Sequence, residues 1–439
     1  MSDAAVDHFV ADFARHAKTL PGAHVPWLAR LREDAIARFA ERGLPTTRDE
    51  DWKYTSVSPI AKRAFALAPR PALPELDIRA FGFDGDATHR LVFVDGHYAP
   101  ALSDIGRLPA GVTLENLASV LTRAPDALEA WLAATAHETV FASLNAAFMS
   151  DGVHLRLSRG VVLDAPIHAL FVSTAVGAMV HPRNVIVAED GAQATLIEHY
   201  AGVDGAASLT NAVTRVFVGA NASIAHERLQ HESAAALHIG AVHASQARAS
   251  RFASHSIALG AALARHDITT VFDADGCNAE LDGLFVAGGR QHVDHHTRID
   301  HAKPHGTSRE YYKGILDGGA RGVFNGKVVV HPGAQRTDAH LASHNLLLSK
   351  TAEIDTKPEL TIDADDVKCA HGATVGQLDD DQLFYLRTRG LDAPFARALL
   401  TYAFAHDVIE RVRVAPLRSV VERVLFARLP DGQRIRELA

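Results

Sequence analysis

The segment DADDVKCAHGATVG (363–376) places a cysteine and a histidine two positions apart. On an extended strand Cys369 and His371 project from the same face, because side chains alternate along a strand. A thiolate beside an imidazole forms a ligand pair suited to iron, zinc or copper(I). The acidic residues just upstream do not favour a lowered thiol pKa, so nucleophilic activation of Cys369 is less natural. The same pattern also suits a buried, inert cysteine beside a structural histidine, and both interpretations stay open.

Histidine is unusually frequent, at 26 of 439 residues, and imidazole is the commonest metal ligand in proteins. On one strand His295 and His296 point to opposite faces and cannot bind one ion together. His296 shares a face with Asp300, and His295 shares a face with His301. One hypothesis is therefore a metal-dependent enzyme of cupin type, although a polar surface role explains each histidine more simply. The histidines form two groups: His292, His295, His296, His301 and His305, then His331, His340 and His344.

Missing motifs exclude several other chemistries. Gly326-Lys327 is the sole candidate for a phosphate-binding loop, but Val328 follows it and Arg321 stands where the first glycine is needed. The sequence has no GxSxG, HExxH or CxxC motif. Two cysteines are too few for a complete iron–sulfur cluster, which normally takes four protein ligands. We therefore expect the isolated chain to bind no metal tightly, and we interpret Cys277 as a structural residue at a corner.

Composition narrows the class of protein. Hydrophobic residues make up 47% and charged residues 22%, as in globular proteins with a sizeable core. The net charge of −8 argues against a nucleic-acid partner, and no run of 18 apolar residues could span a membrane. The acidic amino terminus, MSDAAVDHFVADF, does not resemble a signal peptide. We expect a cytoplasmic protein, which also counts against a carbohydrate-active β-helix protein, a class that is normally secreted.

The pattern of hydrophobic residues divides the chain into three regions. Residues 1–150 are predicted to be mainly helical, and Thr47 and Glu50 fit a capping box. Asp95-Gly96 marks a hairpin turn between short strands at 90–94 and near Tyr98. The last region, 379–439, is again helical, with apolar stripes that are more often core than interface. Helices are expected at 7–16, at 26–42 with Gly43 as its cap, at 114–132, 138–148 and 379–387, after Pro394, and at 416–428.

Residues 151–378 have the alternating apolar and polar pattern of short strands, with hardly any helical interruption. A glycine followed by alanine or cysteine recurs along this region at loosely regular spacing. Such recurrence is typical of the corners of a stacked β-solenoid, where glycine allows sharp turns and alanine packs beneath the next coil. A sandwich or a cupin barrel would also have many short strands, but persistence favours a parallel β-helix. The pairs are Gly191-Ala192, Gly219-Ala220, Gly240-Ala241, Gly260-Ala261, Gly276-Cys277, Gly319-Ala320 and Gly333-Ala334.

Four phrases in the second half of the chain resemble the SufB/SufD family of iron–sulfur cluster assembly proteins. DEDWKYTSV, near the amino terminus, also resembles an early motif of this family. KCAHGATVG has the form of the SufD branch, since SufB carries a glutamate where this chain has Gly372. The additional amino-terminal cysteines of SufB are also missing here. The matching phrases are DHHTRIDHAKPHGTSREYYKGIL, GVFNGKVVV, AQRTDAHLASHNLLLS and AEIDTKPELTIDADDVKCAHGATVGQLDDDQLFYLRTRGL.

The resemblance implies a right-handed parallel β-helix, flanked by helical regions, in a non-catalytic scaffold subunit. Such a subunit pairs with a SufB-type paralogue, and a nascent cluster forms at the interface between them. Cys369 and His371 match the functional Cys-x-His of the family, with His371 the better candidate ligand. The residues leave open whether a reduced flavin binds the assembled complex, while exposed strand edges favour a homodimer when partners are missing. A SufC-type ABC ATPase would dock on the carboxy-terminal helices, with candidate contacts at Leu383, Phe384, Phe395, Leu399 and Tyr402.

Overall fold

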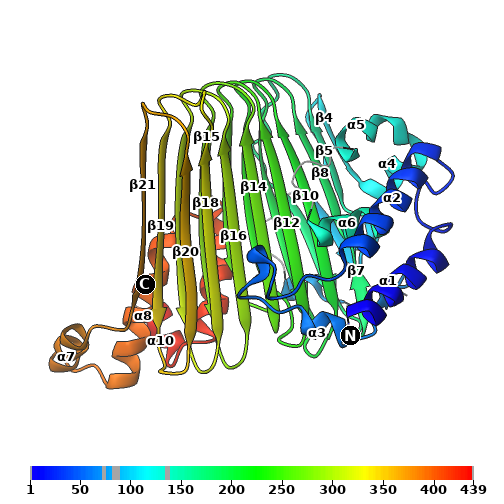
Figure 1. The fold of residues 1–439 in the computed structure, drawn as a ribbon. Coiled ribbons are helices and arrows are strands. Elements are labelled where there is room, and N and C mark those ends of the chain that lie inside the picture. Colours follow the sequence, from blue (N-terminus) through cyan, green and yellow to red (C-terminus); the bar gives the residue numbers. More distant parts are fainter. Residues whose placement is uncertain (1, 72–75, 82–88, 134–138, 438–439) are drawn as a thin grey trace.

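The computed structural model describes residues 2–71, 76–81, 89–133 and 139–437. A parallel β-solenoid forms the centre, with helices before and after it (Figure 1). This architecture confirms the predicted fold class. Among the described residues, no helix is long and apolar enough to cross a membrane. The described helices are α1 (Ser2–His16), α2 (Pro26–Arg42), α3 (Ser58–Ala61), α4 (Leu117–Arg123), α5 (Glu129–Leu132), α6 (Val140–Phe148), α7 (Asp380–Thr388), α8 (Ala393–Ile409), α9 (Ala415–Phe426) and α10 (Gly432–Arg436).

The solenoid strands alternate between two sheets, which we call sheet A and sheet B. Sheet A has the order β20-β18-β16-β14-β12-β10-β8-β5-β4, with β1 and β7 beside this path. Sheet B has the order β21-β19-β17-β15-β13-β11-β9-β6-β2-β3. Sheet A contains β1 (Ala66–Leu67), β4 (Val112–Asn116), β5 (Val153–Leu157), β7 (Ala178–Val180), β8 (Arg183–Ala188), β10 (Leu209–Val218), β12 (Leu237–Gln246), β14 (Leu263–Phe272), β16 (His292–His301), β18 (Arg321–Val330) and β20 (Glu353–Ile362). Sheet B contains β2 (His89–Val94), β3 (His97–Tyr98), β6 (Ile167–Ser173), β9 (Gln193–Gly202), β11 (Ser223–His231), β13 (Arg251–Ala258), β15 (Asn278–Ala287), β17 (Thr307–Leu316), β19 (Asp338–Leu347) and β21 (Lys368–Gly376).

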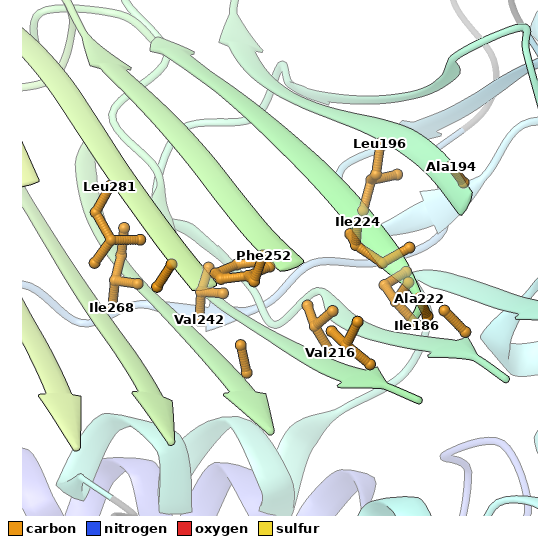
Figure 2. Packing of buried hydrophobic residues seen from close by; sticks show 14 of the residues in the cluster. Ile186, Ala194, Leu196, Val216, Ala222, Ile224, Val242, Phe252, Ile268 and Leu281 are labelled. Carbon is orange, nitrogen blue, oxygen red and sulfur yellow. The ribbon is translucent and has the colours of Figure 1, made fainter. Parts of the chain in front are cut away.

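From β9 to β21 each strand pairs in parallel with strands one turn before or after it. This parallel pairing contradicts the cupin alternative, because a cupin barrel is built from antiparallel strands. The inner faces of the two sheets pack their apolar side chains against each other, as Figure 2 shows for Ile186, Leu196, Val216, Ile224 and Val242. Alternation along each strand therefore decides which residues lie inside the coil and which lie on its surface.

The Gly-Ala and Gly-Cys pairs lie at the corners of the coil, with one exception. Gly191 and Gly276 have φ angles of +73° and +72°, and Cys277 is buried at its corner, as predicted. Gly240-Ala241 instead lies within β12. A Cβ atom at Gly240 would lie 3.0 Å from His238 Nε2, so here glycine makes room for buried imidazoles.

The amino-terminal region differs from the sequence prediction at three places. Residues Val112–Asn116 form a strand that pairs antiparallel with β5, and the helix begins only at Leu117. The capping box is wrong, because Asp49 precedes the 3-10 turn at Glu50–Trp52 and its carboxylate accepts a hydrogen bond from the Thr46 N–H. The first helix begins at Ser2 rather than residue 7, whereas α2, the Gly43 cap and the β2–β3 hairpin are confirmed. The start of the predicted helix at 138 lies outside the described residues, and α6 begins at Val140.

The helices cover the outer faces of the solenoid. The helices α1, α2 and α6 pack against apolar residues at the start of the coil, including Met179, Leu209 and Leu237. The helices α8 and α9 pack against one apolar residue from each of six successive strands of sheet B. Figure 1 shows α7 projecting beyond the last turn. The helices α7 and α9 follow the predicted bounds within two residues, and α8 begins at Ala393, next to the predicted Pro394. The short helix α10 was not predicted.

Candidate functional site

Cys369 and His371 lie on β21, the edge strand of sheet B. The register pairs Cys369 with Ala339 and His371 with Leu341, and both of these partners belong to the inner core of the coil. The two side chains therefore share a face, as alternation predicts, and that face is the inner one. Because β21 belongs to the last turn, no further turn covers His371, which is exposed.

Cys369 differs from His371 in its surroundings. Its side chain is partly buried and packs against the edge of the inner core. Burial raises the pKa of the Cys369 thiol, and the negative charge of Asp338 raises it further. The thiol is therefore protonated at neutral pH, as the acidic neighbourhood in the sequence indicates, and it becomes a strong ligand only when a metal displaces its proton.

The last turn is an open end of the solenoid. The edge strands β20 and β21 have backbone N–H and C=O groups that no described strand pairs with. Ile362 on β20 is 41% exposed, and Val375 on β21 is 49% exposed. Because Val375 pairs with Asn345 in the same alternation as Cys369, it also belongs to the inner face. The open end thus combines unpaired backbone groups, exposed apolar side chains and the Cys-x-His pair.

The five predicted docking residues do not share one environment. Phe395 is fully buried beneath Arg434, whose guanidinium lies 4.1 Å from its ring. Phe395 therefore cannot contact a partner in this conformation. Phe384 on α7 is 68% exposed, and the neighbouring Leu383 is less exposed, with its side chain half-buried. These side chains place the accessible apolar surface on α7 rather than on the inner side of α8.

Leu399 and Tyr402 line a groove of about 500 Å³ between α8, α9 and the carboxy-terminal residues. The Tyr402 hydroxyl donates to Glu422 Oε1 at 3.1 Å, and it lies 3.1 Å from His406 Nδ1. Burial and the Glu422 carboxylate raise the pKa of Tyr402 to about 12, so the hydroxyl remains protonated. The groove is lined by apolar side chains together with charged side chains of both signs.

The two histidine groups do not assemble into one metal site. His295 and His301 point into the core, where burial lowers their pKa to about 3 and about 4. His296 lies on the outer face beside Asp294, at 3.0 Å, and His340 lies beside Asp338, at 3.1 Å. In the part of the chain that the structure describes, the three-residue group with ligand spacing is a different one, His255, Glu280 and Asp282. Sequence reasoning missed that group because His255 lies one turn of the coil away from Glu280 and Asp282.

The inside of the coil is more polar than its sequence indicates. Glu198 is fully buried and accepts hydrogen bonds from Thr214, at 2.5 Å, and Tyr200, at 2.7 Å. Burial raises its pKa, but the His226 imidazole and the hydrogen bonds outweigh burial and lower the pKa to about 2. Further along the coil, Thr356 donates to the Ser343 hydroxyl at 3.3 Å. Polar side chains therefore occur inside the coil from its first turns to the turn next to the open end.

Comparisons with known proteins agree with this architecture. Residues 171–404 match the SufBD core domain of the SUF system for FeS cluster assembly, and residues 4–169 match the SufBD protein N-terminal region. The iron–sulfur cluster assembly protein SufD of Escherichia coli is 34% identical over 405 residues, covering 91% of this chain and 92% of the relative. An iron–sulfur cluster assembly SufBD family protein of Synechocystis is 34% identical over 412 residues, covering 91% of each. The chloroplastic protein ABCI7 of Arabidopsis thaliana is 28% identical over 400 residues, covering 89% of this chain and 84% of the relative. The chain belongs to the SufBD family of iron–sulfur cluster assembly proteins.

Proposed function

We propose that this chain is a non-catalytic scaffold subunit that supplies one side of a nascent-cluster site. The observation that carries the proposal is the open end, where Cys369 and His371 share the inner face of an uncovered edge strand. Of the two cysteines, Cys277 is buried at a corner, so this chain offers too few thiols for a complete cluster. A second chain must therefore supply the remaining ligands, and the cluster is cargo rather than a resident cofactor.

A SufB-type paralogue is the proposed partner at the open end. Unpaired strand edges readily accept the strands of another chain, and the exposed Ile362 and Val375 would be covered by such a contact. A second copy of this chain could occupy the same edges when the paralogue is missing. We place the complex in the cytoplasm, where the two free thiols remain reduced.

A SufC-type ABC ATPase is the proposed partner of the carboxy-terminal helices. This chain lacks a phosphate-binding loop, so nucleotide hydrolysis must come from another subunit. Phe384 offers an exposed apolar contact on α7, and the groove at Leu399 and Tyr402 lies close by on the same helical region. Because α8 packs on β15 and β17, closure of two ATPase copies would shift this solenoid against its partner and expose the site.

Co-expression with SufB-type and SufC-type proteins tests this proposal. Native mass spectrometry of the purified assembly should give the mass of a complex containing all three proteins. The His371→Ala variant should form the same complex but lose its iron and sulfide, because a ligand is removed without any buried contact. The Cys369→Ser variant should lose less, and the absorption spectrum of the assembly would reveal a bound flavin.

The exposed His340, which pairs with Asp338 on the same sheet, provides a matched control. The His340→Ala variant should keep its full content of iron and sulfide. Normal iron and sulfide in the His371→Ala complex would remove the ligand role of this residue. Equal loss in the Cys369→Ser complex would make the thiol the principal ligand.

A further inference from the structure

A cluster of charged side chains lies on the outer face of sheet B, beneath the linker between α8 and α9 (410–414). The parallel register places Glu227, His255 and Asp282 in one row across β11, β13 and β15. Glu280 lies two residues before Asp282 on β15 and so projects from the same face. The solenoid therefore brings an imidazole between carboxylates that are far apart in the sequence.

The geometry within this row is that of a potential metal site. His255 Nδ1 lies 3.0 Å from Glu227 Oε1, and His255 Nε2 lies 3.3 Å from Asp282 Oδ2. One ligand atom each from His255, Asp282 and Glu280 lies within 4.8 Å of the other two. Asp282 is 1% exposed, and its Oδ2 atom faces the His255 imidazole. A buried carboxylate oxygen and an imidazole nitrogen therefore point toward each other inside the cluster.

The donor set decides which ions would fit. Metal-binding histidines commonly donate their other ring N–H to a carboxylate, which fixes the ring and its tautomer. Glu227 occupies that position here, because its Oε1 atom can accept a hydrogen bond from Nδ1 and leave Nε2 for a metal. One imidazole and two carboxylates suit borderline divalent ions such as Zn²⁺ and Fe²⁺, whereas Mg²⁺ prefers oxygen ligands alone.

Two arginines of the linker form ion pairs with the carboxylates of Asp282 and Glu280 in this conformation. Arg411 Nη1 lies 3.3 Å from Asp282 Oδ1, and Arg413 Nη2 lies 2.8 Å from Glu280 Oε2. Both guanidinium groups are close to half exposed, so their own charges stay solvated when they turn away, and a bound ion would then compensate the buried Asp282. The cluster is electrically balanced without an ion: Glu227, Glu280 and Asp282 face His255, Arg411 and Arg413.

We propose that His255, Asp282 and Glu280 form a site for an exchangeable divalent transition-metal ion, and that Arg411 and Arg413 compete with the ion. Binding would release the proton of His255 to solvent and would free Glu280 from Arg413. The ion exchanges rather than being held permanently, because Arg411 and Arg413 pair with two of its three ligands when it is absent. This site is distinct from Cys369 and His371, and it does not depend on the proposed scaffold role.

Titration of the metal-stripped full-length chain with Co²⁺ and Zn²⁺ tests the inference. Calorimetry should show about one ion bound per chain. The visible Co²⁺ spectrum should lack a thiolate charge-transfer band, because no cysteine belongs to the site. Millimolar Mg²⁺ should leave the bound Co²⁺ in place. A thiolate band, or displacement by Mg²⁺, would overturn the assignment.

Matched variants locate the bound ion. The His255→Gln and Asp282→Asn variants should each bind Co²⁺ at least tenfold more weakly, whereas His340→Ala should bind it unchanged. Circular dichroism melting would show whether the buried substitutions keep the fold. The Arg411→Gln/Arg413→Gln double variant retains every ligand and should bind Co²⁺ about tenfold more tightly. Unchanged affinity in the double variant, or in folded His255→Gln protein, would overturn the proposal.

Discussion

At the scale of single residues, Glu310 is an ionisable group inside the coil. It lies on β17, is buried, and forms no ion pair with any described residue. Burial raises the pKa of Glu310 to about 8, which the Thr297 hydroxyl offsets slightly. Unfolded chains ionise this carboxyl near pH 4.5, whereas the folded chain holds the proton until about pH 8. Stability is therefore highest below pH 4.5, as far as Glu310 is concerned, and falls as the pH rises toward 8.

The Glu310→Gln variant should not lose stability as the pH rises toward 8, because the amide has a similar shape and cannot ionise. We expect its unfolding temperature at pH 8.5 to exceed that of the unaltered protein by a few degrees. At pH 4.5 the two proteins should unfold at nearly the same temperature. Differential scanning calorimetry at both pH values measures this, and an equal difference at both would contradict the explanation.

The sequence predicts only part of the candidate sites at this scale. Cys369 and His371 are correctly placed on one face, because alternation along a strand is local. The spacing cannot say that this face is the inner one, since that depends on the pairing of β21 with β19. His255 and Asp282 pair only through the register of neighbouring turns, so the sequence offers no local signal for them.

At the scale of elements, α7 and α8 divide the predicted docking residues between surface and core. The Phe395→Ala variant should lower the free energy of unfolding by about 3–5 kcal/mol, because it leaves a cavity beneath Arg434. The Phe384→Asp variant should change stability little, because Phe384 is exposed. Urea denaturation measures both values.

Binding to the ATPase should depend on Phe384, although the stability of the chain should not. The Phe384→Asp variant should weaken binding of a SufC-type protein at least tenfold, since a charge replaces an exposed apolar contact. Calorimetric titration with the purified ATPase measures the affinity, with Val176→Asp as a control on a similarly exposed apolar residue outside α7. Unchanged affinity for the Phe384→Asp chain would move the docking surface away from α7.

A second element, the segment at 50–57, is fixed across the outer face of sheet A. Arg265 stacks on Trp52 at 3.9 Å, donates to the backbone carbonyl of Asp51 and pairs with the buried Asp294 at 2.9 Å. The Arg265→Ala variant should lower the free energy of unfolding by about 3 kcal/mol, because the buried Asp294 carboxylate loses its guanidinium partner and keeps only His296 and Thr55. Limited proteolysis should then cut near residue 50, and equal resistance to cleavage would refute this role.

The periodicity of apolar residues predicts where an element lies in the sequence better than it predicts what packs against that element. Both α2 and α8 follow from apolar spacing and a proline near the first turn, and Gly43 marks the end of α2. The same stripe on α8 cannot reveal that sheet B covers it and buries Phe395. The predicted helix at 114–132 overlaps the strand β4, because the pairing of β4 with β5 is not local and decides its conformation.

At the scale of the whole molecule, the open end should control association. The Val375→Lys and Ile362→Lys variants place a charge on an edge strand, which opposes pairing with another strand. We expect both variants to fold normally and to lose the SufB-type partner while retaining the ATPase. Native mass spectrometry measures the composition, and intact pairing in both variants would exclude this edge as the interface.

The solenoid could be predicted from the sequence because a Gly-Ala or Gly-Cys pair recurs at several of its corners and strand patterns persist between them. The repeated pairs do not show that successive strands alternate between two sheets. They also do not show that β2 and β4 join those sheets. Those features depend on contacts between residues from different regions of the chain. The cupin alternative failed for the same reason, since histidine spacing carries no information about whether strands pair in parallel.

The packing of α8 and α9 across sheet B has a mechanical consequence. These helices contact Ile197, Leu229, Ile257, Leu284, Ile315 and Leu346, one from each of six neighbouring strands. A torque applied to the helices is therefore distributed over most of the length of the sheet rather than concentrated on a single strand. The coil should rotate as a stiff lever, so that a small displacement at the helices becomes a larger sweep at its far edge.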